Sequence, residues 1–310
     1  MDGATLTREL TGLLGESSGS SYLDSKSTYD YLYEAAAVTV QRTDCLTGTQ
    51  TITTVAEQRD YYLDADFMKL YLTDSQNRMF IKYNNGSADS FIYPITYDSI
   101  ILGDNDTSQS IPSSFTIRDA TPIATVSSTV TSDGAASGGV CTLTDTASNF
   151  TTLKVSVGDF VNNVSDVSHG VVVAITSATA LVTALFAGSN NDWTSGDSYH
   201  IHPQGRFYLT LDPPPSTSSH TITVYYVKKP APVYSSYYSY KLPMSYKSAL
   251  VQYAAWLYKY RDREPNYGDA WFKYWDLNVR RIGREMNAAR MTPSFRVNFI
   301  KRATNWGSYK

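Results

Sequence analysis

The chain has 310 residues, 42% of them hydrophobic, so it can bury a substantial core, and its length predicts one large domain or two smaller ones, of which we favour two. No run approaches the ~20 consecutive apolar residues of a membrane helix, and the start MDGATLTREL lacks the basic segment and apolar run of a secretory signal. Cys45 and Cys141 fall in regions that we assign to different domains, which argues against a disulfide framework. We expect a soluble protein made in the cytoplasm.

The net charge of −3 conceals a split between two parts of the chain. From Lys241 onward there are 14 Lys/Arg against 5 Asp/Glu, a net charge of +9, whereas residues 1–240 hold 12 against 24, a net charge of −12. Such asymmetry indicates an electrostatic partner or self-assembly through complementary faces. The alternative interpretation is a basic helix face that is simply solvated.

Two helices are predicted at the N-terminus. Residues 4–14 carry leucines at helical spacing, and residues 24–42 begin with the capping residues Asp24 and Ser25 and place apolar side chains on one face. We expect the second helix to pack on a C-terminal helical hairpin, because no other apolar helix face is available to cover it.

After Cys45 the hydrophobic pattern changes to a period of two, which predicts a small antiparallel sheet. Its strands include TQTITTV, FMKLYLT and RMFIKY, and a further strand breaks at Pro94 into one helical turn. RFYLTL and HTITVYYVK are predicted to resume this sheet as a pair across the PPPSTSS turn. Residues 120–203, rich in Ser, Thr, Val, Ala, Gly and Asn, predict an inserted small β-barrel or sandwich that hangs outward.

Residues 242–287 predict the helical hairpin. Apolar and aromatic residues recur at helical spacing in the first helix (Tyr246, Leu250, Tyr253, Leu257, Tyr260) and in the second (Tyr267, Trp271, Trp275, Val279, Ile282, Met286). The opposite face of the second helix is basic: Lys273, Arg280, Arg281 and Arg284. This basic helix face suits an acidic protein surface or, without sequence readout, the phosphates of DNA.

The predicted fold is therefore α+β, with a helical-bundle core made by the two N-terminal helices and the C-terminal hairpin, a small antiparallel sheet, and the inserted β-domain. Residues 1–119 and 204–287 form the core, residues 120–203 the insertion, and residues 288–310 an extended arm. In the arm, apolar residues alternate with mostly polar ones from Pro293 to Arg302, so it either frays or adds as a strand or clamp to a neighbouring subunit.

Tyrosine is unusually common, with 25 residues, and it keeps a polar tip while burying a large ring. In the linker before the hairpin, a cluster that looks exposed is best explained as a contact surface: Tyr234, Tyr237, Tyr238 and Tyr240.

Catalytic chemistry has little support in the sequence. His200 and His202 would share one face of a strand, the minimum for a metal pair, but no third ligand follows at a suitable spacing, so ordinary strand histidines are the better interpretation. There is no nucleophile elbow, phosphate-binding loop, dinucleotide fingerprint or paired-carboxylate motif, and Asp64 and Asp66 flank a turn. We expect no enzyme, no metal and no cofactor.

Several sequence segments, and the order in which they occur, resemble the head-to-tail adaptor (connector, head-completion) proteins of tailed bacteriophages. They are YDYLYEAA, TITTVAEQRDYYLDADFMKLY, RFYLTLDPPP, TITVYYVKKPAP and LPMSYKSALVQYAAWLYKYRDREPNYGDAWFKYW, and the resemblance covers about 1–105 and 204–290. It implies a structural virion protein at the head–tail junction: a homo-oligomeric ring, typically a dodecamer, under the portal protein. Such a ring receives the tail nozzle or tail tube, and genomic DNA passes through its lumen as an ejection channel.

The same resemblance implies that the C-terminal segment reaches toward the portal. The arm residues that we expect to bind the portal are Arg290, Phe295, Arg296, Val297, Phe299, Lys301, Arg302 and Trp306. The clustered tyrosines of the linker indicate contact with a subunit or the tail, and the position and low charge of the inserted β-domain indicate contact with tail fibres. Two alternatives stay open: another neck or tail protein such as a nozzle or stopper, and a carbohydrate-binding or adhesin module suggested by the Ser/Thr-rich β-region.

Overall fold

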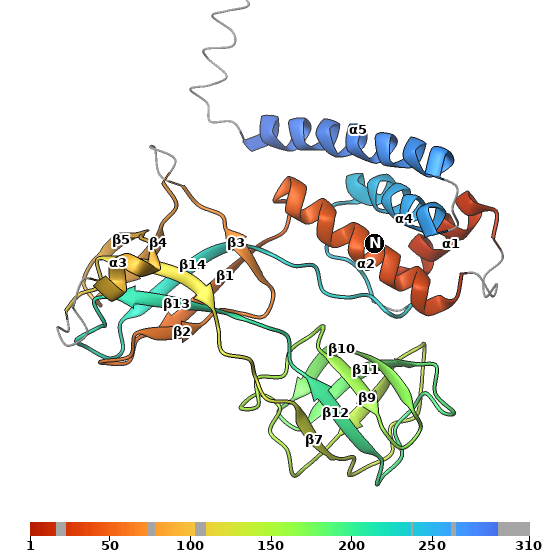
Figure 1. Cartoon of the computed structure of the whole chain (residues 1–310), viewed down its shortest axis with the longest axis horizontal. Coiled ribbons are helices and arrows are strands. Elements are labelled where there is room, and N and C mark those ends of the chain that lie inside the picture. The colour runs from red at the N-terminus through yellow and green to blue at the C-terminus, as the bar shows by residue number, and fades with distance from the viewer. Residues whose placement is uncertain (17–22, 74–77, 103–109, 237, 262–264, 291–310) are drawn as a thin grey trace, which may run out of the picture.

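The computed structural model describes residues 1–16, 23–73, 78–102, 110–236, 238–261 and 265–290, with the backbone alone for residues 265–267 and 284–290. These residues form five α-helices and fourteen strands (Figure 1). The strands form two sheets, of eight and of six strands, and each sheet has its own buried apolar cluster. The four longer helices, the larger sheet with one short helix, and the smaller sheet appear as three bodies joined by extended segments (Figure 1).

The predicted α+β fold with a helical-bundle core is wrong, because the protein is mostly β. The physical reason is that the helical repeat of apolar residues is easier to detect in a sequence than the two-residue repeat of a strand. Helices of up to 26 residues repeat their apolar positions over many turns, whereas most strands have only three to eight residues and so display few alternations. The sequence therefore overstates the helical part, which is one of three cores rather than the centre of the fold.

Helices α1 (Gly3–Leu14), α2 (Ser25–Thr43), α4 (Lys247–Arg261) and α5 (Pro265–Arg290) make one cluster. The side chains of Asp2 and Asp24 cap the first two helices, each accepting a backbone N–H at 2.7 Å. Helix α2 packs on α4, which confirms the expected contact with the C-terminal hairpin. Helix α4 begins at Lys247, directly after the 3₁₀ turn η1 (Met244–Tyr246).

The larger sheet has the order β1-β14-β4-β5-β6-β13-β2, and β3 also pairs with β14. Its strands are β1 (Thr47–Thr53), β2 (Asp60–Tyr62), β3 (Phe67–Leu70), β4 (Ile81–Asn84), β5 (Asp89–Pro94), β6 (Ser114–Asp119), β13 (Phe207–Asp212) and β14 (Thr221–Lys228). Helix α3 (Tyr97–Leu102) follows the break at Pro94, as predicted. The predicted pairing of β13 with β14 is wrong, because β4, β5 and β6 lie between them. The parallel pairing of β5 with β6 also departs from the antiparallel prediction.

One side chain joins the two outer strands of this sheet. The amide nitrogen of Gln50 in β1 donates to the carbonyl of Tyr62 in β2 at 3.1 Å, and its amide oxygen accepts the Asp64 N–H at 3.0 Å. Because the outer strands otherwise present unpaired backbone groups, this bridge brings the sheet close to a closed barrel.

The smaller sheet has the order β7-β12-β9-β10-β11-β8. Its strands are β7 (Val126–Thr129), β8 (Cys141–Thr144), β9 (Phe160–Asn163), β10 (Ser168–Ser177), β11 (Ala180–Phe186) and β12 (Ser198–His202). The chain after β7 returns to β8, where the Thr131 N–H donates to the Thr144 carbonyl at 2.8 Å and Ser132 forms a bridge. This contact joins the two ends of the sheet, which we call the β7–β12 barrel.

The barrel packs on the helical part of the chain along one face, and its expected outward placement in an assembly stays a prediction. The outer face of β10 and β11 packs on Tyr234 and on Tyr29 of α2 through Val171, Val173 and Ala184. In Figure 1 the barrel accordingly lies beside α2. The linker that carries Tyr234 runs between these bodies on its way from β14 to α4.

A candidate interaction surface on helix α5

The inner face of α5 carries the predicted apolar stripe. Trp275, Val279 and Ile282 are buried, and the Trp275 ring lies 4.9 Å from that of Tyr253 in α4. The Trp275 indole N–H also donates to the hydroxyl of Thr39 in α2 at 3.3 Å. The hydrophobic spacing in the sequence thus identified the face that holds α5 on α4 and α2. The stripe predicted for the first helix of the hairpin is buried at Tyr246 in η1 and at Leu250 and Tyr253 in α4, whereas Tyr260, near the end of α4, is exposed.

The outer face of α5 is both apolar and basic. Tyr274 and Leu277 are 54% and 63% exposed, and the cations Lys273, Arg280 and Arg281 are exposed beside them. Their spacing of three, four and seven residues places all five on one side of the helix. Large exposed apolar side chains next to arginine and tyrosine are typical of protein interfaces. We call these five residues the α5 outer surface.

An acidic residue orients part of this surface. The carboxylate of Asp276 pairs with Arg280 at 2.8 Å, one turn along the helix, and with Arg42 of α2 at 3.2 Å. Both cations are more than half exposed, so these pairs are surface pairs that contribute little to stability. Their effect is to place two guanidinium groups side by side across the α2–α5 boundary.

The structure places only part of the predicted site. Lys273, Arg280 and Arg281 share the exposed face, while the side chain of Arg284 lies outside the described residues. Arg290 ends α5, with its side chain also outside the description. The remaining predicted arm residues lie outside the described residues: Phe295, Arg296, Val297, Phe299, Lys301, Arg302 and Trp306. The sequence analysis did not predict Tyr274 and Leu277 as part of this surface. Their positions outside the apolar stripe of the helix could have indicated that they are exposed.

The tyrosine linker is not the exposed surface expected from its composition. Tyr234 and Tyr240 are buried, Tyr238 is half-buried, and Tyr237 lies outside the described residues. The linker pairs with the N-terminus, where the Tyr240 N–H donates to the Met1 carbonyl at 2.9 Å and the Gly3 N–H to the Tyr238 carbonyl at 3.0 Å. Burial raises the pKa of the Tyr240 hydroxyl well above its usual range.

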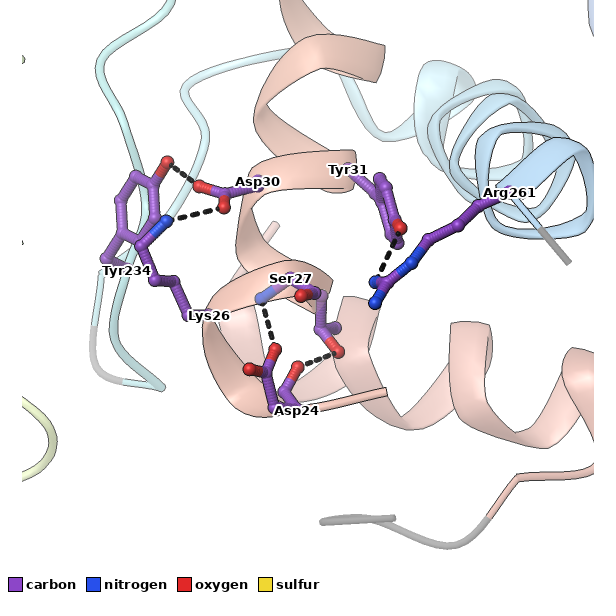
Figure 2. A network of polar contacts seen from close by, with 8 residues as sticks. Asp24, Lys26, Ser27, Asp30, Tyr31, Tyr234 and Arg261 are labelled. Carbon is purple, nitrogen blue, oxygen red and sulfur yellow. Dashed lines mark hydrogen bonds and ion pairs between the residues drawn. The ribbon is translucent and has the colours of Figure 1, made fainter. Parts of the chain in front are cut away.

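Tyr234 belongs to a polar network at the start of α2 (Figure 2). Its hydroxyl donates to Asp30, which also pairs with Lys26 at 2.8 Å, and burial followed by the nearby carboxylate raises the pKa of Tyr234. On the other side of α2, Arg261 of α4 donates to the Tyr31 hydroxyl at 3.1 Å. The network therefore ties α2 to both the linker and α4.

The polar residues considered for chemistry have structural settings. The rings of His200 and His202 lie 6.4 Å apart on the barrel surface, and within the described residues no group of three or more His, Cys, Asp or Glu side chains could hold a metal ion. The Tyr226 hydroxyl contacts both Asp64 (3.1 Å) and Asp66 (2.8 Å), and burial raises the pKa of Asp64. Sequence reasoning missed this buried contact, because Tyr226 lies 160 residues along the chain from Asp66.

Comparison with known proteins supplies no family for this chain. No protein-family model matches the sequence, and no curated protein does. A search of the helices in the described part of the chain finds none with the length and apolar character to cross a membrane.

Proposed function

We propose that the chain is a structural virion protein, a head-to-tail adaptor that forms a ring between the portal protein and the tail around the DNA exit channel. Its sequence resemblance to phage adaptors supports this role, and so does the charge split between residues 1–240 and the C-terminal part. The observation that carries the proposal is the α5 outer surface, where Tyr274 and Leu277 stand exposed between basic side chains. A protein that works alone gains nothing from exposing such a surface, whereas an assembly subunit buries it.

The proposed mechanism is docking rather than catalysis. The α5 outer surface packs against acidic and apolar groups of a neighbour, either the next subunit or the portal. This surface is positively charged and the rest of the chain is acidic in excess, which favours a contact between two different surfaces of neighbouring subunits. Such head-to-tail contacts form a closed ring when the rotation from one subunit to the next adds up to a full turn. DNA passes through the ring without sequence-specific contacts, and the C-terminal arm grips the portal.

The experiment mixes the purified full chain with portal rings of the same virus and counts bound copies by native mass spectrometry. We expect the wild-type chain to decorate the rings. Leu277→Asp places a charge in the centre of the proposed contact and should weaken assembly by at least about tenfold. The matched control is Ile101→Asp, because Ile101 is 61% exposed, against 63% for Leu277, and lies on helix α3 of the larger sheet.

The wild-type chain failing to bind portal rings at any accessible concentration refutes the adaptor role. Equal assembly by the Leu277 and Ile101 variants keeps the role but refutes its assignment to the α5 outer surface. Circular dichroism of both variants confirms that each is folded before assembly is compared.

A further inference from the structure

A second site lies where the barrel meets α2. A cavity of about 360 Å³ opens there, within the range of small-molecule pockets. It is lined by residues of the barrel strands and by Lys26, Asp30 and Tyr234. Figure 2 shows these last three side chains close together at the start of α2. The proposed portal contact uses none of these residues.

The register of the strands explains how the floor is assembled. Phe160 in β9 lies directly opposite His202 in β12 and Val171 in β10, and His169 in β10 lies opposite both Asn162 in β9 and Phe186 in β11. Residues directly opposite each other in antiparallel strands point to the same face of the sheet. Four neighbouring strands thus present aromatic, imidazole and amide side chains on one surface.

The apolar part of the cavity is aromatic. The Phe160 side chain is 64% exposed although it sits in the middle of a sheet surface. Phe186 and Tyr234 lie with ring centroids 6.0 Å apart and line the cavity wall. An exposed phenyl ring between polar neighbours offers a flat apolar face that a ligand can cover.

The polar part of the cavity is arranged in advance. His202 contacts the Thr125 hydroxyl through Nδ1 and the Asn162 amide nitrogen through Nε2, both at 3.3 Å. These contacts hold the imidazole and the carboxamide in place. In the described part of the chain the amide oxygen of Asn162 has no hydrogen-bond partner, so it remains available to accept one from a ligand.

The charges of the cavity cancel. Lys26 and Asp30 pair at 2.8 Å, and Asp30 also accepts the Tyr234 hydroxyl. A cationic ligand would meet a carboxylate already occupied by Lys26, and an anionic ligand would meet Asp30. A neutral ligand avoids both conflicts, and it needs hydroxyl groups for the amide and imidazole together with an apolar face for Phe160.

We infer that this cavity binds a neutral sugar residue of a glycan. A pyranose ring has the required combination, with an apolar C–H face and a rim of hydroxyl groups that both donate and accept. Stacking and a few hydrogen bonds to a single sugar residue predict weak binding, with a millimolar dissociation constant. Several copies of the protein in an assembly would raise the overall affinity for a glycan through multivalency.

The test uses saturation-transfer NMR on the full chain. The probes are glucose, galactose, mannose and N-acetylglucosamine, with acetate and choline as charged probes. We expect transfer to at least one of the four sugars and none to the charged probes. Phe160→Ala should weaken the sugar signal by about fivefold or more, because it removes the apolar platform while leaving an exposed position.

Phe91→Ala is the matched control, since Phe91 is also an exposed phenylalanine in a strand, 56% exposed, but lies in the larger sheet. It should bind sugar as the wild type does. Asn162→Ala supplies a second variant that removes the amide acceptor and should also weaken binding. The inference is overturned if no sugar shows transfer, if Phe160→Ala binds as well as Phe91→Ala does, or if acetate or choline binds this site instead. Sugar binding and portal binding use separate surfaces, so either experiment can fail without the other.

Discussion

The hydroxyl of Tyr234 donates a hydrogen bond to the carboxylate of Asp30, 204 residues away in the sequence, and so fastens the linker to helix α2. The same tyrosine packs on Tyr29 and Phe186 at ring distances of 5.9 and 6.0 Å, which places it between α2 and the barrel. The Tyr234 side chain therefore helps to position the linker, helix α2 and the barrel relative to one another.

Replacing this hydroxyl should destabilise the protein. Tyr234→Phe keeps the ring but removes the donor to a charged acceptor, which should lower the free energy of unfolding by about 1.5–3 kcal/mol. Urea denaturation followed by far-UV circular dichroism measures the loss. Tyr274→Phe is the control, because Tyr274 is exposed on α5, and its change should stay within about 0.5 kcal/mol. Equal effects of the two variants would contradict the assigned role of the Asp30 contact.

Closure of the barrel depends on a glycine. A Cβ at Gly134 would lie 1.9 Å from the Thr142 carbonyl oxygen in β8, so Gly134→Ala must push the segment after β7 away from β8. We expect a loss of more than about 2 kcal/mol in unfolding free energy, measured by urea denaturation. Gly205→Ala is the matched control, because nothing lies within 4 Å of its Cβ position. A harmless Gly134→Ala would show that the barrel is not closed at this point.

Two carboxylates should respond to pH in opposite directions. Burial raises the pKa of Asp64 above its model-compound value of 3.8, whereas hydrogen bonds from the Ser27 side chain and backbone lower the pKa of Asp24. The folded state therefore holds the Asp64 proton more tightly than the unfolded state, and this contribution to stability is lost as pH rises from 3.8 through the raised pKa. For Asp24 the contribution is present above 3.8 and is lost as pH falls through the lowered pKa.

Single asparagine variants test these signs. Asp64→Asn should gain stability relative to the wild type as pH rises from about 3 to about 6, and Asp24→Asn should lose stability relative to the wild type over the same interval. Urea denaturation at several pH values gives both comparisons. A pH-independent difference for either variant would contradict the pKa direction assigned to that residue.

The predicted arm is tested by removing residues 291–310, which leaves helix α5 complete. If the arm grips the portal, the shortened chain should bind portal rings at least about tenfold more weakly, because an extended segment contributes many contacts. Its thermal unfolding midpoint should match that of the full chain. Unchanged portal binding would refute the clamp and leave the α5 outer surface as the remaining candidate contact.

Local sequence signals identified much of the local structure. The capping residues Asp2 and Asp24 begin α1 and α2, although only the second was singled out in the sequence, and the spacing of Trp275, Val279 and Ile282 defines the buried side of α5. The change to period two after Cys45 and the break at Pro94 were also readable. These features depend on neighbours within a few residues, which is why composition and spacing carry them.

The candidate site could be predicted only in part, because sequence patterns report on residues close together in the chain and not on distant partners. The sequence shows the basic residues of α5 as a cluster. Because they lie on the side of the helix opposite the buried apolar stripe, their exposure could be predicted. The burial of Tyr234 and Tyr240 was not readable, because their partners are Asp30 and the N-terminal residues, more than 200 positions away. A Pro/Tyr/Ser composition suits both an exposed linker and a buried one, and only the packing of α2 and the barrel around it distinguishes them.

The sequence by itself determined where the long helices form, where the hydrophobic pattern changes to a period of two, which helix faces are apolar, and that positive charge concentrates toward the C-terminus, because each of these depends on residue type and short spacing. Tertiary structure alone decided that the protein is mostly β, that β4, β5 and β6 separate β13 from β14, and that β9, β10, β12 and α2 enclose a cavity. Strand order and domain contact arise from long-range backbone pairing and burial, and no local pattern specifies which distant segment will supply the partner.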